Sequence, residues 1–180
     1  MRTPHLQKVE EYKDQVLEIN RVTRVTKGGK RMRFRTTVVI GNMKGRVGVG
    51  VAKGIDVVES IAKAKSQAKK NLIEVKMKNK SIPHIVEAKY SAARIIIKPA
   101  VAGHGLMAGG SARVVLNMAG INDVTAKYIS RTTNKLANAM VAIEALKKLK
   151  SAKNFLPTGR QEASSTKAQN DNAKPKDSNI

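Results

Sequence analysis

Polar and apolar residues alternate most regularly between residues 29 and 41. One parity is apolar and the other carries mainly basic side chains. A repeat of two is typical of a β-strand whose two faces meet different surroundings. The pattern predicts a strand with its apolar face on a core (Met32, Phe34, Val38, Ile40) and its polar face outward (Arg31, Arg33, Arg35, Thr37).

The preceding segment, residues 16–26, is rich in β-branched residues and predicts a partner strand. Its apolar residues Ile19, Val22 and Val25 do not alternate strictly, which predicts a bulge or a twist there. Between the two strands, Lys27-Gly28-Gly29-Lys30 predicts a hairpin turn, because glycine tolerates the positive φ angles of tight turns.

A third strand is predicted after a turn at residues 41–45. Valines at positions 47, 49 and 51 alternate there with Gly48, Gly50 and Ala52, so that one face is almost bare. A bare face lets another backbone approach closely, and that backbone can belong to the protein or to RNA.

A helix is predicted from the capping-box-like pair Asp56 and Glu59 to about Leu72. Its apolar residues fall on one side at steps of three and four, with lysines off that stripe. Three strands and one helix make a first module, and double-stranded-RNA-binding domains use a sheet with one helix to hold a duplex by shape and phosphates.

The second half of the chain predicts a separate α/β unit after a lysine-rich link at residues 76–81. Its expected strands cover 82–90 and 94–98, the latter ended by Pro99, with a short strand or turn at 121–125. Its expected helices cover 112–119, with Ser111 as N-cap and Gly120 as C-cap, and the region from Leu136 to Leu149.

These elements predict an α+β fold of two domains. The first is a double-stranded-RNA-binding-like three-stranded sheet with one helix, and the second is a two-layer α/β sandwich. The expected boundaries are an N-terminal arm at 1–14, in which 6–13 forms a short helix or extended arm, domains at 15–76 and 82–150, and a disordered tail at 151–180, where periodicity is absent.

Charge narrows the range of partners. The chain of 180 residues has 35 Lys and Arg against 13 Asp and Glu, a formal net charge of +22. Residues 19–55 contain basic residues but no acid, which indicates a polyanionic partner. With Cys and Trp absent, disulfides, cysteine zinc sites and aromatic base-stacking platforms are not expected. No membrane span or targeting segment is recognisable, so the expected location is cytoplasmic.

The stretch from Pro99 to Ala112 is the one candidate for nucleotide binding, since a glycine-rich loop before a helix can cradle phosphate. It lacks the Lys-Ser ending of a Walker loop and is somewhat similar to the phosphate loop of GHMP-type small-molecule kinases. The acids nearest in sequence, Glu87 and Asp123, are isolated, and no catalytic triad or metal set is recognisable. We therefore expect no enzymatic activity and no cofactor, and we expect His104 to be an exposed loop residue.

Several short motifs, in order, resemble bacterial-type small-subunit ribosomal protein five. They match from about residue 10 to residue 149: Asn20-Arg21-Val22, Lys27-Gly28-Gly29-Lys30-Arg31, Gly45-Arg46-Val47-Gly48-Val49-Gly50, Ala62-Lys63-Ala64, Lys69-Lys70-Asn71-Leu72-Ile73, Ile82-Pro83-His84, Lys98-Pro99-Ala100 and Ala108-Gly109-Gly110. The resemblance implies a structural protein of the small ribosomal subunit that binds 16S-type rRNA. It also implies contacts with ribosomal proteins four and eight, a place near the channel by which mRNA enters, where head and body meet, and an influence on translational accuracy.

By position, the resemblance carries over two sets of residues. The RNA-binding set is Arg21, Arg24, Lys27, Gly28, Gly29, Lys30, Arg31, Arg33, Arg35, Lys44, Arg46, Lys53 and Lys63. The set expected to contact a neighbouring protein is Gly103, His104, Gly105, Gly109, Gly110 and Arg113.

The chain departs from the family pattern at Asn42, Met43, Ala52, Lys135 and Met140. The first and second stand in a loop that is usually Asp-Gly-x-Gly, and Ala52 replaces a glycine. Lys135 stands for a proline and Met140 for an arginine. Two other functions stay open at this point: a free-standing regulator of duplex RNA and a small-molecule kinase.

Overall fold

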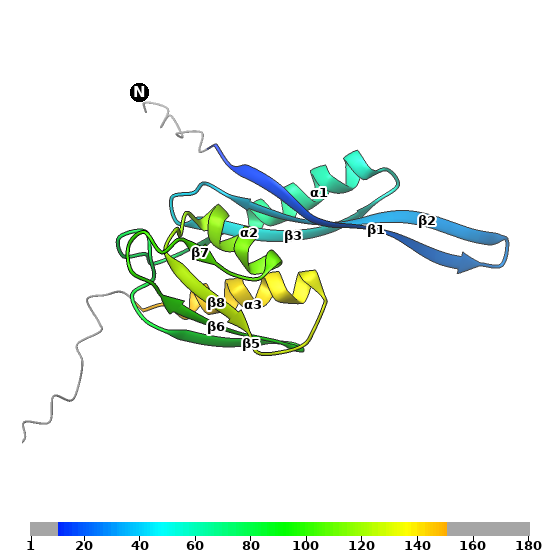
Figure 1. Cartoon of the computed structure of the whole chain (residues 1–180). Coiled ribbons are helices and arrows are strands. Elements are labelled where there is room, and N and C mark those ends of the chain that lie inside the picture. Colours follow the sequence, from blue (N-terminus) through cyan, green and yellow to red (C-terminus); the bar gives the residue numbers. More distant parts are fainter. Residues whose placement is uncertain (1–10, 151–180) are drawn as a thin grey trace, which may run out of the picture.

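The computed structural model describes residues 11–150, so most of the predicted N-terminal arm and the whole predicted tail lie outside the described residues. Figure 1 shows its layers in the order α1, a first sheet, α2 with α3, and a second sheet. The prediction of an α+β fold is confirmed. One hydrophobic cluster joins valines of the first sheet to α2, α3 and the second sheet, so the two predicted domains pack on a shared core.

The first sheet is antiparallel and is covered on one face by a single helix. Its order is β1-β2-β3-β4, and its elements are β1 (Lys13–Thr26), β2 (Gly29–Gly41), β3 (Arg46–Gly54), β4 (Ile73–Glu74) and α1 (Val57–Lys70). The short β4 extends the predicted three-stranded sheet by one strand. β1 begins inside the segment 1–14 that was predicted as an N-terminal arm.

The bulge in β1 lies earlier than predicted. The pairing with β2 shifts between Val16 and Glu18 and is continuous from there to the turn. The irregular apolar spacing has another cause: Val22 pairs with Arg33, on the opposite face from Ile19 and Val25. The predicted irregularity in residues 16–26 is therefore present, but at Val16–Glu18 and not between Ile19 and Val25.

The bare face of β3 receives protein backbone. A Cβ built on Gly50 would lie 2.2 Å from the carbonyl oxygen of Ala64, and one on Gly48 would lie 2.5 Å from that of Ala68. The helix presents small buried residues, Ser60, Ala64 and Ala68, to these glycines. The close approach that the glycines permit is thus the packing of α1, and not of RNA, on the sheet.

The other face of the first sheet is also covered over its inner half. Thr37 and Val39 share the parity of the arginines, yet both are buried, and Val39 belongs to the core shared with the second domain. The prediction that this whole face points outward is wrong for that half. Strand periodicity in β2 cannot reveal a covering that comes from residues more than 70 positions later in the chain.

The second domain is a mixed sheet with both its helices on one face. Its order is β5-β6-β8-β7, with β5 (Val86–Tyr90), β6 (Ala93–Pro99), β7 (Leu106–Met107), β8 (Val124–Tyr128), α2 (Gly110–Ala119) and α3 (Lys135–Lys147). The expected first strand starts at Val86 and not at Ile82, and Pro99 pairs as the last residue of β6.

The N-cap of α2 is Gly109, so the prediction of Ser111 was wrong, whereas Gly120 is the C-cap as predicted, with a left-handed φ of 86°. The two domains meet at the C-terminal end of α2. The turn between β2 and β3 donates backbone hydrogen bonds from Met43 to the carbonyl of Met118 at 3.0 Å and from Gly45 to that of Ala119 at 2.9 Å. These bonds satisfy carbonyls that a helix end leaves without a partner.

Candidate nucleic-acid interface

The β1–β2 hairpin projects beyond the rest of the first sheet (Figure 1). Because β3 ends at Gly54, opposite Phe34, residues 22–33 continue as a two-stranded ribbon, which we call the arm. The predicted hairpin turn is confirmed, with Thr26 Oγ1 donating to the carbonyl of Gly29 at 3.0 Å and Gly29 at a φ of 132°. The sequence from 19 to 35 thus places basic residues on a projecting, hydrogen-bonded strand pair.

One face of the arm and of the adjoining sheet is densely cationic. We call it the arginine face, and its members are Arg24, Arg31, Arg33, Arg35 and Lys53. Cross-strand pairing sets Arg24 directly opposite Arg31 and Arg35 directly opposite Lys53. Arg31 and Arg33 are exposed, as predicted, and Arg35 is half-buried.

A depression of about 470 Å³ opens on the arm, and no acidic residue lines it (Val22, Thr23, Arg24, Thr26, Arg31, Arg33, Lys53). Like charges directly opposite each other on a sheet are destabilising, by roughly 0.2–1 kcal/mol per pair. An anion between them would remove this repulsion. The arginine face thus concentrates like charges that a negatively charged partner would offset.

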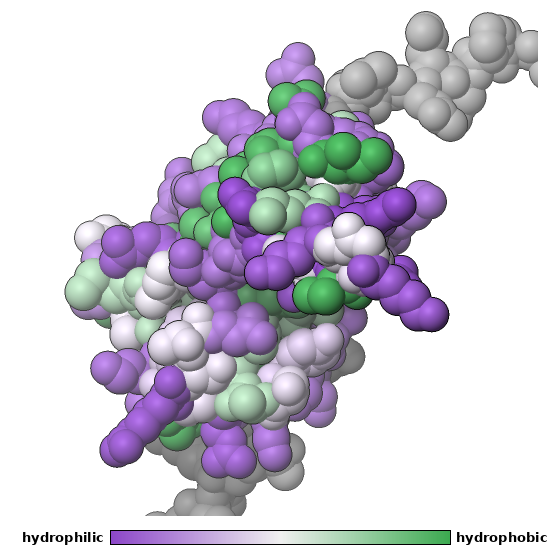
Figure 2. All heavy atoms as spheres, turned by 90° about the vertical axis from the view of Figure 1, so that its right-hand side faces the viewer, coloured by the Kyte–Doolittle hydropathy of each residue, from purple (hydrophilic) through white to green (hydrophobic). Residues whose placement is uncertain are grey.

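The opposite face of the arm is mixed. Arg21 and Lys30 lie there among apolar side chains, since Arg21 pairs with Phe34 and Lys30 with Val25. Met32 is 47% exposed, so the prediction that this apolar parity rests on a core holds for Val38 and Ile40 but not for the arm. Figure 2, which looks onto the arm end of the molecule, shows hydrophobic residues among hydrophilic ones.

The remaining predicted RNA-binding residues lie elsewhere. Lys27, Gly28 and Gly29 form the tip of the arm, whereas Lys44 and Arg46 lie at the far end of the sheet. β3 has 9 residues, so Lys53 and Arg46 stand apart by roughly 23 Å at about 3.3 Å per residue. The structure therefore gathers five of the predicted cations on one face and spreads the others over different surfaces.

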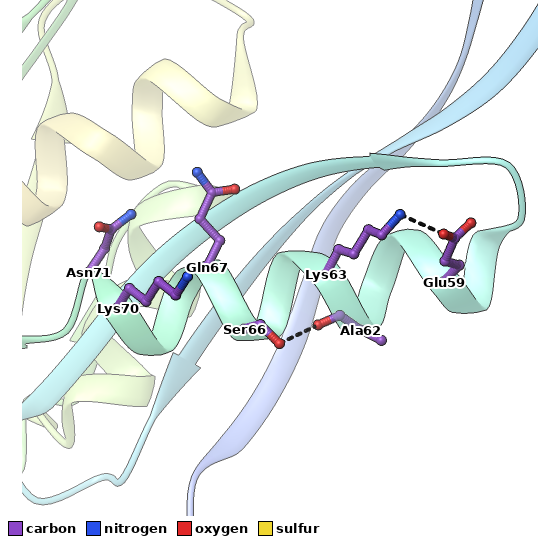
Figure 3. Close-up of a pocket in the computed structure, with 7 residues that line it drawn as sticks. All are labelled: Glu59, Ala62, Lys63, Ser66, Gln67, Lys70 and Asn71. Carbon is purple, nitrogen blue, oxygen red and sulfur yellow. Dashed lines mark hydrogen bonds and ion pairs between the residues drawn. The ribbon is translucent and has the colours of Figure 1, made fainter.

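Lys63 lies on the outer side of α1, across the sheet from the arginine face. Figure 3 shows it beside a shallow pocket on that helix, directed at Glu59 one turn earlier. Their ion pair is 2.5 Å long, and this hydrogen bond lowers the pKa of the Glu59 carboxyl, with a further contribution from the amide of Ile55. Lys63 is thus partly neutralised within its own helix.

The glycine-rich loop of the second domain is held from within the protein. The amides of Gly103 and Gly105 both donate to Asp123 Oδ1 at 3.0 Å. Asp123 thereby accepts the amides that a phosphate loop would offer to a phosphate. Sequence analysis missed this role because Asp123 lies 18 and 20 residues after its partners and carries no local signal. His104, between them, is exposed as predicted.

Gly109 and Arg113 line a second depression, of about 400 Å³, at the edge of β8. Gly109 is required there because an added Cβ would lie 2.6 Å from the ring of Tyr128. The hydroxyl of Tyr128 donates to the carbonyl of Asn138 at 3.2 Å, and burial raises its pKa to about 12. Gly110 is exposed at the start of α2.

The departures from the family pattern have definite places in the structure. The side-chain oxygen of Asn42 accepts the amides of Lys44 and Arg46, which closes the β2–β3 turn. Met43 has a left-handed φ of 55° at the position where the resemblance expects glycine. Ala52 packs against α1, Lys135 is the first residue of α3, and Met140 contacts the shared core.

Within residues 11–150, no group of three or more His, Asp or Glu side chains could hold a metal ion. In the same part of the chain, no helix is long and apolar enough to cross a membrane. The described surface thus includes a cationic ribbon with a depression, a further depression beside Gly109 and a glycine loop with an internal partner.

The chain is similar to known proteins over most of its length. Two family models match: ribosomal protein S5, N-terminal domain, over residues 12–76, and ribosomal protein S5, C-terminal domain, over residues 88–156. Curated relatives are called small ribosomal subunit protein uS5c in Rhodomonas salina, 45% identical over 80% of this chain and 86% of the relative, and small ribosomal subunit protein uS5 in Campylobacter jejuni, 47% identical over 78% and 95%. The uS5 protein of Thermotoga neapolitana is 44% identical over 78% of each chain.

Proposed function

The chain belongs to the ribosomal protein S5 family, and from that premise we propose that its arginine face is a principal contact with small-subunit rRNA. Members of this family are structural, non-enzymatic proteins of the small ribosomal subunit that bind rRNA. The proposal concerns which residues do this. Phosphates of folded rRNA lie against the arm, and the depression between its basic side chains receives the backbone of one strand.

The cross-strand opposition of like charges on the arm is the observation that carries the proposal. Arg24 faces Arg31, and Arg35 faces Lys53, without an acid on either strand from residue 19 to the end of β3. Phosphate binding by such side chains releases condensed counterions from the RNA. If about ten phosphates are engaged, the logarithm of the binding constant falls against log salt with a slope of roughly −7 to −9.

The test is the double substitution Arg33→Glu, Arg35→Glu in the full chain. Two lost phosphate contacts reduce the salt slope by about 1.5 and the rRNA affinity at 0.2 M salt by roughly tenfold or more. Filter binding to small-subunit rRNA over a salt series measures both quantities. Thermal unfolding in parallel should show little change.

A matched control is Lys69→Glu, Lys70→Glu on the outer side of α1, where both lysines are exposed. It changes the net charge by the same amount on a different surface. The proposal predicts a much smaller loss for this control. Equal affinities of the two variants would mean that net charge alone, and not the arginine face, governs binding.

We further propose that the second domain contacts ribosomal proteins four and eight near the channel by which mRNA enters, at the junction of head and body. The glycine loop and the depression beside Gly109 and Arg113 would lie toward protein four. Such a contact can bias the subunit between open and closed forms and so affect accuracy. Substitution of Arg113 by Glu is expected to change misreading in a reporter assay, and an unchanged reporter would count against this part.

A further inference from the structure

Within residues 11–150, one face of the second sheet is covered by no helix. Its inward residues, including Val86, Ile95 and Val124, pack against α2 and α3. Figure 1 shows both helices on the side toward the first sheet, with the opposite side of β5, β6 and β8 left open within residues 11–150. We call this side the open face, and its side chains are Glu87, Lys89, Arg94, Ile96, Lys98, Thr125 and Lys127.

The open face is mainly basic, as the arm is, but it includes one acid. It holds basic side chains on each of its three main strands against a single acid, Glu87, whose carboxylate lies 3.7 Å from Arg94. Lys89 and Arg94 are direct cross-strand partners. Glu87 partly offsets the charge of Arg94. The cations that remain for a negatively charged partner on this face are therefore Lys89, Lys98 and Lys127.

The chemistry of the face favours RNA over a protein partner. Protein interfaces have apolar and aromatic centres and are depleted in lysine. Here the centre is the half-buried Ile96, between Glu87 and Lys127, and lysines surround it. Exposed lysine and arginine at strand spacings suit a phosphodiester backbone, which needs positive charge and no apolar pocket.

We propose that the open face binds the phosphate backbone of a second rRNA segment, distinct from the one on the arginine face; this inference rests on the proposed function. The two surfaces face the same way, since each points away from α1. They belong to different layers, because α2 and α3 lie between the sheets. A single row of phosphates cannot follow both, and the chain therefore bridges two parts of the folded rRNA.

The test is Lys89→Glu, Lys98→Glu in the full chain, which leaves Lys127 and the depression beside Gly109 unchanged. Both lysines are exposed, so the substitutions should not disturb folding, and the neutral variant Lys89→Gln, Lys98→Gln provides a milder form. Two lost contacts reduce the rRNA affinity at 0.2 M salt by roughly tenfold and the salt slope by about 1.5. Chemical footprinting should lose one protected segment and keep the segment protected by the arm.

The outcomes separate this inference from the proposed function. The control is again Lys69→Glu, Lys70→Glu. If the open-face variant matches that control while Arg33→Glu, Arg35→Glu loses affinity, the inference is overturned and the proposed function stands. If the open-face variant keeps every footprint but fails to associate with a purified ribosomal protein, the partner is a protein and the inference is also overturned. If the arm variant matches the control, it is the proposed function that fails.

Discussion

Between Thr36 and Ile40, β2 is buried on both faces, whereas between Gly29 and Arg33 the same strand is exposed on both. The inner half has α1 on one side and the second domain on the other, and its side chains are threonine, valine and isoleucine. The outer half has only β1 beside it and carries the arginines. The buried half anchors a strand pair whose exposed half can then hold its cations in fixed positions.

The largest expected effect comes from a substitution that disrupts packing around the buried inner half of β2. Gly50→Ala places a Cβ within 2.2 Å of the carbonyl of Ala64, on the backbone of α1, so the helix must move. We expect a loss of about 3 kcal/mol in the free energy of unfolding. Urea denaturation measures it.

The matched substitution in the outer half is Gly28→Ala, at the tip of the arm. An added Cβ there meets no atom within 4 Å, and we expect a change within about 0.5 kcal/mol. If the two variants are equally stable, the distinction between an anchored half and a free half is wrong.

A smaller effect is expected on the arm, where one substitution should raise the stability of the free protein and lower its affinity for rRNA. Arg24→Glu turns the like-charge pair with Arg31 into an opposite-charge pair. The free protein should gain about 1 kcal/mol at most, whereas rRNA affinity should fall. Urea unfolding of the variant measures the expected rise in stability, and filter binding measures the expected fall in rRNA affinity. Arg24→Gln should give intermediate values of both. A simultaneous loss of stability and affinity would contradict the account of the arginine face.

The smallest effect concerns the inner end of β2. Met43 holds a φ of 55°, and a left-handed conformation costs a side-chain-bearing residue about 1–2 kcal/mol. Glycine removes that cost, but its greater conformational freedom stabilises the unfolded chain by about 0.4–1 kcal/mol. Met43→Gly should therefore stabilise the chain by about 0.5 kcal/mol in urea denaturation, since the amide bond to Met118 is retained. A destabilised variant would show that the Met43 side chain contributes to the domain junction.

Local patterns in the sequence predict much of this structure. The alternation in residues 29–41 locates the strand and its arginines, Gly28 and Gly29 locate the turn, and the glycines of β3 predict a close backbone approach. Each of these depends on neighbours in sequence. The resemblance to the ribosomal family, now confirmed, adds rRNA as the class of partner.

What the sequence could not predict depends on distant residues. The burial of Val39 needs the second domain, and the role of Asp123 needs a loop 18 residues earlier. The short strands β4 and β7 have two residues each, too few for periodicity, and exist through their pairing with β3 and β8. The dispersal of Lys44, Arg46 and Lys63 away from the arginine face likewise follows from the fold and not from their spacing.

The most direct measurement uses the absence of cysteine from the chain. A single cysteine introduced at Arg33, on the arginine face, can carry a tethered iron chelate that cleaves nearby RNA by hydroxyl radicals, and one at Gln67, on the outer side of α1, serves as the control. With the protein assembled into small subunits, the account predicts strong rRNA cleavage at a single compact region from position 33 and much weaker cleavage from position 67. Strong cleavage from position 67 with none from position 33 would contradict it.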